Sequence, residues 1–242
     1  MRKYNYGSII LILIVNAIIA RILQNIADGN LSILSGFVAF IFDYIICRGL
    51  LYNREGSFSD YFRGIKTMTG KVFLMNILVG AITVALLTLA ALASGAGFLL
   101  FSDYAIKDTK IVISLIVLFT LVMIFTSLIF AYLNFFMADE RYRDLTFFDS
   151  LKLILKAGIK LFSESFMAGV KAYKITLLAG LIALATGILA IKTPMASILA
   201  FTFGIIAAIA LFFCTPPFRA SLSDIYMDRS EEIYNEVIGC ED

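Results

Sequence analysis

Histidine is missing from this sequence of 242 residues, and charged residues make up only 16% of it. Without histidine there is no imidazole to act as a general base, to bind a metal ion or to complete a serine–histidine relay. The sequence also lacks the GxSxG motif, the P-loop and the glycine-rich nucleotide fingerprint. We therefore expect a protein that is not an enzyme, has no catalytic residues and uses no cofactor.

Cysteine is scarce. The three cysteines, Cys47, Cys214 and Cys240, are odd in number and show no CxxC spacing. This pattern favours free thiols over a disulfide framework or a cysteine-based metal site.

The middle of the chain contains a cluster of acidic residues that could in principle hold a divalent cation. The cluster consists of Asp139, Glu140, Asp144 and Asp149. Arg141 and Arg143 alternate with these acids and offset their charge. We therefore predict no metal site.

Long apolar runs dominate what is present. Hydrophobic residues make up 61% of the chain, and its mean hydropathy is +0.93. A soluble domain carries about 25% charged residues, and a helix needs about 20 apolar residues to cross a bilayer. The runs are continuous rather than alternating, which favours helices over a barrel. We predict an all-α integral membrane bundle, one domain over 1–242, with six transmembrane helices near 8–27, 31–51, 72–94, 109–137, 174–191 and 195–214.

Positive charge is distributed unevenly between the two sides that these spans define. Of the 20 lysines and arginines, 16 fall on one side. These are Arg2, Lys3, Arg48, Arg54, Arg63, Lys66, Lys71, Arg141, Arg143, Lys152, Lys156, Lys160, Lys171, Lys174, Arg219 and Arg229. The other four are Arg21, Lys107, Lys110 and Lys192. Because cytoplasmic loops are enriched in lysine and arginine, the distribution predicts that both termini are cytoplasmic.

The spans are expected to form three helical hairpins, each followed by a cytoplasmic amphipathic segment. Short connections near 27–30, 94–108 and 192–194 join the spans in pairs. Residues 57–65 resemble residues 146–154, and the same offset relates 131–139 to 220–228. This similarity predicts an internal repeat with possible units 1–71, 72–173 and 174–242.

The repeated segments begin with the pattern of a capping box. Ser57 and Thr146 each precede an aspartate by three residues, Asp60 and Asp149. The hydroxyl can accept a free backbone amide, and the carboxylate favours the positive end of the helix. Both segments are therefore expected to start helices that lie at the membrane surface.

The central segment carries a basic face. Its candidate docking residues are Arg141, Arg143, Lys152, Lys156 and Lys160. Such a face suits the anionic cytoplasmic leaflet or a partner protein. The alternative is an elbow that only connects two spans. An acidic tail after 228 is expected to be a solvated helix end.

Asp43 is the most notable single residue, because it lies inside a predicted span. Asn16 in the neighbouring span is expected at a similar depth, with Arg21 further out, so these three residues form a candidate intramembrane polar site. An ionisable group in the membrane is costly and is a functional candidate. The alternative is a hydrogen bond or ion pair that joins two helices. Asn76 and Asn134 are two further polar groups in predicted spans.

Parts of the chain resemble a broad family of uncharacterised prokaryotic membrane proteins. The residues that carry the resemblance are Met137-Ala-Asp139, the stretch Phe147-Phe-Asp-Ser150 to Gly158, and Ala220-Ser-Leu-Ser-Asp-Ile-Tyr226-Met-Asp228. These proteins are similar to the membrane domain of glycerophosphoryl diester phosphodiesterases. The resemblance implies a helical membrane module in a prokaryotic cytoplasmic membrane. The soluble phosphodiesterase barrel is missing, so that activity is not inferred.

Taken together, these patterns favour a non-catalytic membrane component of a transport or export system for a hydrophobic small molecule, lipid or peptide. Its expected partners are membrane lipid and a cytoplasmic ATPase or another membrane protein, with no nucleic acid. The alternative is a structural or regulatory membrane protein, such as a stress or immunity factor, that binds lipid or another membrane protein. An enzyme acting on lipid ranks third.

Overall fold

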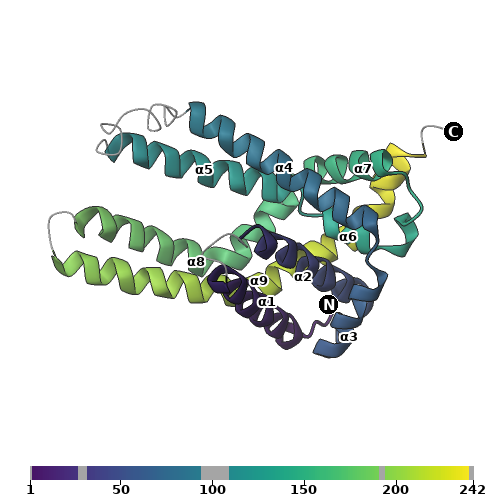
Figure 1. Cartoon of the computed structure of the whole chain (residues 1–242), viewed down its shortest axis with the longest axis horizontal. Helices are drawn as coiled ribbons and strands as arrows, with labels where there is room; N and C mark the ends of the chain where they lie inside the picture. The colour runs from purple at the N-terminus through teal and green to yellow at the C-terminus, as the bar shows by residue number, and fades with distance from the viewer. Residues whose placement is uncertain (1, 27–31, 94–108, 191–193, 240–242) are drawn as a thin grey trace. The chain divides into compact units, whose positions relative to one another are not determined.

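The computed structural model describes residues 2–26, 32–93, 109–190 and 194–239, and every regular element in these ranges is helical (Figure 1). The α-helices are α1 (Tyr6–Ile26), α2 (Ser32–Tyr52), α3 (Phe58–Arg63), α4 (Gly70–Ala93), α5 (Thr109–Ile129), α6 (Leu133–Ala138), α7 (Phe147–Lys160), α8 (Phe162–Ala190) and α9 (Pro194–Val237). Two short 3₁₀ helices are η1 (Gly64–Thr67) and η4 (Glu140–Tyr142). The predicted connections at 27–30, 94–108 and 192–193, together with Cys240, lie outside the described residues.

Six stretches of helix within the described ranges are long and apolar enough to cross a membrane. They are Tyr6–Ile26, Leu34–Tyr52, Gly70–Ala93, Ile116–Ala138, Phe162–Gly187 and Met195–Val237. The prediction of an all-α chain with six membrane-spanning helices is confirmed at this level.

The chain divides into two compact units, each built from two pieces of sequence. The first unit contains Met1–Met68 and Ser163–Glu231, and the second contains Thr69–Phe162 and Glu232–Asp242. These boundaries do not coincide with the predicted repeat units 1–71, 72–173 and 174–242. The internal repeat stays a prediction.

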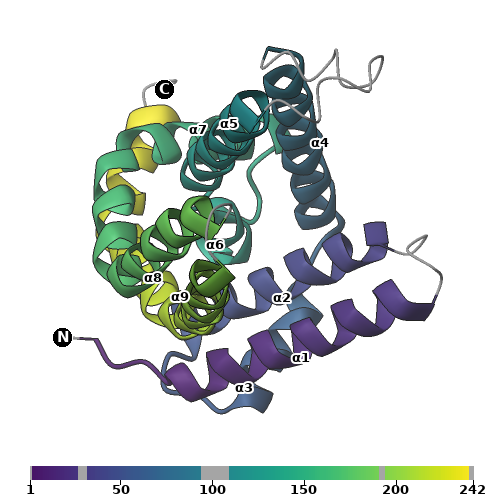
Figure 2. The ribbon, with the colours of Figure 1, turned by 90° about the vertical axis from the view of Figure 1, so that its left-hand side faces the viewer.

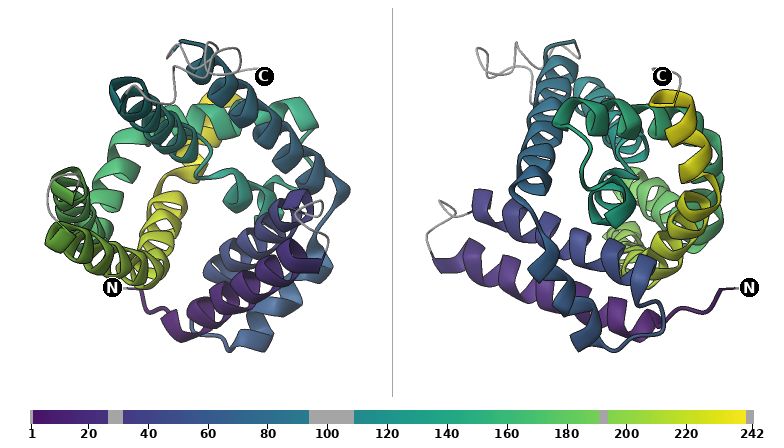
Figure 3. Two further views of the ribbon diagram at one scale, coloured as in Figure 1. Left: turned by 60° about the vertical axis from the view of Figure 1, so that its left-hand side comes forward. Right: turned by 90° about the vertical axis from the view of Figure 1, so that its right-hand side faces the viewer.

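In the first unit, α1 packs along α2 and α3 packs against both helices (Figures 2 and 3). The buried side chains of α1 and α2 include Ile9, Ile12 and Ile45, and Tyr61 of α3 is also fully buried. Gly49 of α2 lies against the Tyr61 ring so closely that a Cβ at position 49 would overlap it. A small residue at this position therefore lets α2 and α3 approach each other. The helices α8 and α9 lie side by side (Figures 1 and 2).

In the second unit, α4 packs against α5, and α7 packs against both. Predicted span 109–137 is not one continuous helix: α5 ends at Ile129, and α6 begins at Leu133. The Leu133 amide bonds the Phe130 carbonyl, which interrupts the α-helical pattern. Gly158 of α7 lies directly against the Ile129 carbonyl, where a Cβ could not fit. The interruption thus coincides with the close contact between α5 and α7.

The two predicted helix starts have the expected local geometry. At α3, the Ser57 amide donates to the Asp60 carboxylate at 2.9 Å, and the Asp60 amide donates to the Ser57 carbonyl at 3.0 Å. At α7, the Asp149 amide donates to the Thr146 hydroxyl at 3.2 Å. The hydroxyl and carboxylate side chains of each pair also bond each other. At α3, the amides of Ser57 and Asp60 therefore both have hydrogen-bond partners, whereas amides at a helix start otherwise lack partners within the helix.

Helix α9 continues well beyond the predicted end of the last span near 214. It runs through Pro216 and Pro217 to Val237. Prolines remove two backbone donors, which membrane helices tolerate when neighbouring groups compensate. The hydroxyls of Thr215 and Ser221 bond backbone carbonyls one turn earlier, at 2.8 and 2.9 Å. The resulting helix has an apolar half and a polar C-terminal part that begins at Arg219.

Candidate functional site

The N-terminal segment is attached to the polar part of α9 in the first unit. Arg2 forms ion pairs with Asp224 at 3.0 Å and with Asp228 at 2.6 Å. Tyr4 donates its hydroxyl to Asp224 at 2.5 Å. The hydrogen bonds that Arg2 donates to Asp228 and Asp224 raise the pKa of Arg2. Burial, with the bond to Asp224, raises the pKa of Tyr4. Ser221-Leu-Ser-Asp224 resembles the other two helix starts in sequence, but it lies inside α9. Its Asp224 side chain binds the N-terminal segment.

The same segment also contacts the connection that follows α2. The Asn5 amide donates to the Arg54 carbonyl at 2.8 Å, and the Asn5 side chain donates to the Gly56 carbonyl at 3.0 Å. Ser8 donates its hydroxyl to the same Gly56 carbonyl at 2.9 Å. Three segments that the charge distribution assigns to one side of the membrane therefore meet in this unit.

Asp43 forms an ion pair with Arg219 of α9 at 2.5 Å, and each side chain is about one quarter exposed. This partner is distant in sequence and was not among the candidates, Asn16 and Arg21. The Asn16 side chain is half-buried, with its oxygen buried and without a hydrogen-bond partner in the described structure. Arg21 is exposed. A guanidinium that neutralises Asp43 reduces the cost of placing a carboxylate in the membrane.

A second contact connects α8 to the same part of α9. Tyr173 donates its hydroxyl to Thr215 at 3.4 Å, and its ring lies 5.1 Å from the ring of Phe218. Thr215 and Arg219 are four residues apart and share one face of α9. Polar contacts at one end of the apolar stretch of α9 therefore join it to α2 and α8.

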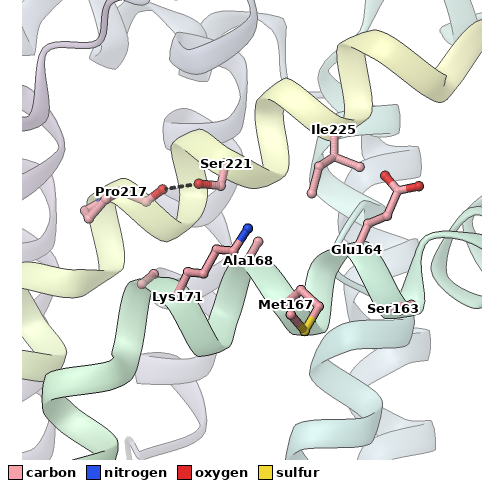
Figure 4. Close-up of a pocket in the computed structure, with 9 residues that line it drawn as sticks. Ser163, Glu164, Met167, Ala168, Lys171, Pro217, Ser221 and Ile225 are labelled. Carbon is pink, nitrogen blue, oxygen red and sulfur yellow. Dashed lines mark hydrogen bonds between the residues drawn. The ribbon is translucent and has the colours of Figure 1, made fainter.

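A groove of about 630 Å³ runs between α8 and α9 within the first unit (Figure 4). Its lining comes from residues spaced by one helical turn on each helix. These residues are Ser163, Glu164, Met167, Ala168, Lys171 and Ala172 of α8, with Pro217, Ser221 and Ile225 of α9. The groove therefore has walls of small and apolar residues, with two charged residues, Glu164 and Lys171, in its lining. The lining does not include Asp43.

The two charged groups of the groove differ in their partners. Glu164 contacts Arg229 at 3.6 Å, with 47% and 41% of the side chains exposed, so this pair is weakly held. Lys171 is exposed and makes no ion pair or hydrogen bond within the described part of the chain. Figure 4 shows Lys171 and Glu164 on the side of α8 that faces α9. The groove therefore offers a cation and an anion to a ligand.

The proposed docking face on α7 is partly occupied by the chain itself. In the second unit, Lys156 pairs with Glu236 at 2.9 Å, and Lys160 pairs with Glu232 at 2.9 Å and Glu236 at 2.6 Å. The hydrogen bonds that Lys160 donates to Glu236 and Glu232 raise the pKa of Lys160. Those from Lys160 and Lys156 lower the pKa of Glu236 to about 2. The end of the acidic tail is thus an ion-pair partner of α7, which the sequence alone did not indicate.

Two of the three remaining basic candidates, Arg141 and Lys152, lie close to local acids. Arg141 binds Asp139 at 2.7 Å, and Asp139 is 3% exposed. Lys152 lies 3.9 Å from Asp149, and Arg143 is exposed. Asp139 therefore serves to hold the turn before α7. Among the described residues, no group of three or more cysteines and carboxylates is arranged to hold a metal ion.

The two asparagines of the second unit are brought together. Asn76 of α4 donates to the Val72 carbonyl at 2.9 Å and to the side-chain oxygen of Asn134 at 3.0 Å. Asn134 is buried. This bond joins α4 to α6 and accounts for two polar groups that the sequence placed in spans without assigning them a partner.

Comparison of the chain with protein-family models, curated proteins and solved structures gives no match. The resemblance to the membrane domain of glycerophosphoryl diester phosphodiesterases therefore stays a prediction.

Proposed function

We propose that the chain is a non-catalytic, multi-pass protein of a prokaryotic cytoplasmic membrane that serves as a membrane component of a transport or export system. Its cargo is an amphiphile: a lipid, a hydrophobic small molecule or a peptide. The observation that supports this proposal is the groove between α8 and α9, where small and apolar walls lie between Lys171 and Glu164.

The position of the groove along its helices fits an amphiphile. On α8 the lining ends at Ala172, just before the apolar stretch that begins at Ile175. On α9 it begins at Pro217, just after the apolar stretch that ends at Phe213. A site at this boundary reaches both the headgroup region and the hydrocarbon region of a bilayer.

Contacts between the predicted cytoplasmic segments support a topology of three hairpins with both termini in the cytoplasm. In the first unit, the N-terminal segment binds both the connection after α2 and the polar part of α9. In the second, Lys71 donates to the carbonyls of Arg143 and Leu145. These contacts fit a topology in which the joined segments lie on one side of the membrane.

A cytoplasmic ATPase or another membrane protein remains the proposed partner, with the basic face of α7 as its docking surface. Because Glu232 and Glu236 already pair with Lys156 and Lys160, a partner has to compete with them. An acidic partner surface has the charge that this exchange needs.

Filling the groove tests the proposal. Ala168→Trp places a large side chain in the lining, whereas Ala185→Trp adds the same side chain at an exposed position of α8 outside it. We expect Ala168→Trp to reduce the retention of bound lipid in native mass spectrometry of the purified protein, and Ala185→Trp to leave it unchanged. Equal lipid retention in the two variants would refute a role for the groove.

The alternative, a structural or regulatory membrane protein, is favoured by one observation. Asp43 is neutralised by Arg219, as expected of a pair that joins helices. A carboxylate that takes part in transport needs to exchange its partner during the cycle. If the groove binds no amphiphile and Asp43 affects stability alone, the form of this alternative that binds another membrane protein is preferred.

A further inference from the structure

The order of the two charged residues along the α8–α9 groove indicates which kind of amphiphile fits it. Glu164 and Lys171 are seven residues apart, so they lie on nearly the same face of α8, about 10 Å apart along the axis at 1.5 Å per residue. Lys171 is nearer to the apolar stretch that starts at Ile175, and Glu164 is nearer to the polar start of the helix. The cation is therefore the deeper of the two groups, and the acid is nearer to water.

A phospholipid with an amine headgroup has the complementary order. Its phosphate lies next to the glycerol, and its ammonium lies further out. We propose that the groove binds a phospholipid that carries a phosphate and a primary ammonium, with Lys171 at the phosphate and Glu164 at the ammonium. This inference rests on the proposed function, because it names the amphiphile that occupies the same groove.

Between Lys171 and Glu164 the lining leaves room for the headgroup arm that joins the phosphate to the ammonium. Met167 and Ile225 line the groove from the two helices, while Ala168 and Ala172 leave room between them. Met is unbranched and adapts its shape to an irregular ligand. The chain of a lipid held at Lys171 can then extend along α8 towards the apolar stretch.

Other headgroups satisfy the groove less well. A quaternary ammonium has no N–H to donate to Glu164. Phosphatidylglycerol satisfies Lys171 through its phosphate, but its terminal glycerol offers Glu164 only uncharged hydroxyl donors, which form weaker hydrogen bonds to a carboxylate than an ammonium does. The contact between Glu164 and Arg229 at 3.6 Å is exposed and weak, so a primary ammonium can replace it or share the carboxylate.

Nanodiscs of defined composition provide the test. The full-length protein is titrated with dioleoyl phosphatidylethanolamine, phosphatidylcholine and phosphatidylglycerol, which share their acyl chains, and bound lipid is counted by native mass spectrometry. We expect phosphatidylethanolamine to bind about tenfold more tightly than phosphatidylcholine, which corresponds to one charge-assisted hydrogen bond at a partly exposed site. Phosphatidylglycerol is expected to bind more weakly than phosphatidylethanolamine.

Two substitutions separate the two charges. Glu164→Gln should remove the preference for phosphatidylethanolamine over phosphatidylcholine, and Lys171→Gln should weaken the binding of all three lipids. Lys174→Gln is the matched control, because Lys174 is an exposed cation of α8 that does not line the groove. It should leave all three affinities unchanged.

The outcomes distinguish this inference from the proposed function. If Ala168→Trp abolishes lipid binding but wild type binds all three lipids equally, or binds phosphatidylglycerol best, the headgroup assignment is wrong and the groove still binds an amphiphile. If Glu164→Gln keeps the full preference, the assignment is also wrong. If Ala168→Trp changes the binding of no lipid, both the inference and the proposed function fail.

Discussion

At the scale of single residues, Gly158 is the glycine, among those in the described ranges, where an added Cβ would come closest to a neighbouring atom. A Cβ there would overlap the backbone carbonyl of Ile129, and a backbone atom cannot rotate away as a side chain can. Gly158→Ala should therefore force α7 away from α5 and lower the free energy of unfolding by about 1–3 kcal/mol, the usual cost of overpacking. Thermal unfolding in mild detergent measures the change.

Gly180→Ala is the control for this substitution. Gly180 lies in α8, and nothing lies within 4 Å of a Cβ added there. Because alanine favours helix more than glycine, this variant should be neutral or slightly stabilising. A Gly158→Ala protein as stable as Gly180→Ala would contradict the close packing of α5 and α7.

Asp43 is a second residue whose role can be measured. Asp43→Asn leaves Arg219 without its carboxylate, and we expect a loss of roughly 2–4 kcal/mol in the free energy of unfolding, given that removing one partner of a buried pair is costly. The double variant Asp43→Asn/Arg219→Gln should recover part of this loss, because it removes both charges. The measurement is chemical unfolding in mild detergent, with the exposed Arg21→Gln as control.

The comparison between single and double variants decides the role of the pair. Equal stability of Asp43→Asn and wild type would show that the ion pair between Asp43 and Arg219 does not stabilise the fold. Loss of lipid binding or transport at unchanged stability would instead favour a functional carboxylate.

At the scale of elements, the contact between α7 and the end of α9 depends on pH. Glu236 has a pKa lowered to about 2, so its ion pairs with Lys156 and Lys160 contribute fully above the ordinary glutamate value of 4.5. The contribution is lost progressively as pH falls from about 4.5 towards 2. Because the pKa of Lys160 is raised, its contribution is present below its ordinary value of 10.5 and is lost as pH rises above it.

A substitution isolates this effect. The stability difference between wild type and Glu236→Gln should be largest near neutral pH and should shrink below pH 4.5, as thermal unfolding measured across the acid range would show. It should also shrink at high salt, because the groups are exposed and screened. Glu231→Gln, at an exposed acid five residues earlier in α9, should show neither dependence. A pH-independent difference for Glu236→Gln would argue against the ion pairs.

At the scale of the whole molecule, the proposed topology makes a direct prediction. Single cysteines at positions 107 and 156, introduced into a variant that lacks the native cysteines, should react with a membrane-impermeant thiol reagent from opposite sides of the membrane. The reason is the excess of lysine and arginine on the side that contains position 156. Labelling of both positions from the same side would overturn the assignment of the termini.

How much of this structure can be predicted from the sequence depends on how far apart in the sequence the interacting residues lie. The six apolar helices and the caps at Ser57 and Thr146 depend on residues close in sequence, and they were predicted. The partner of Asp43 is Arg219, and that of Lys160 is Glu236. Nothing in local spacing connects such distant residues, so these ion pairs were not predicted. The groove was not predicted for the same reason, since it needs two helices in contact.

The helix ends show a second limit. The break after Ile129 contains neither glycine nor proline, and its position corresponds to the close contact with Gly158. Conversely, α9 continues through Pro216 and Pro217, where the local sequence favours an end. In both places tertiary packing and side-chain hydrogen bonds decide where the helix ends.

The first unit is built from two pieces that are far apart in the sequence, and this affects how the protein folds during synthesis. Its pieces, Met1–Met68 and Ser163–Glu231, are separated by most of the second unit, so α1, α2 and α3 leave the ribosome long before α9. Chains fold from the N-terminus as they are synthesised. Asp43 must therefore enter the bilayer before its counter-ion Arg219 exists. Until the ribosome has synthesised Arg219, the nascent first unit lacks the ion pair that Asp43 forms with it in the folded chain.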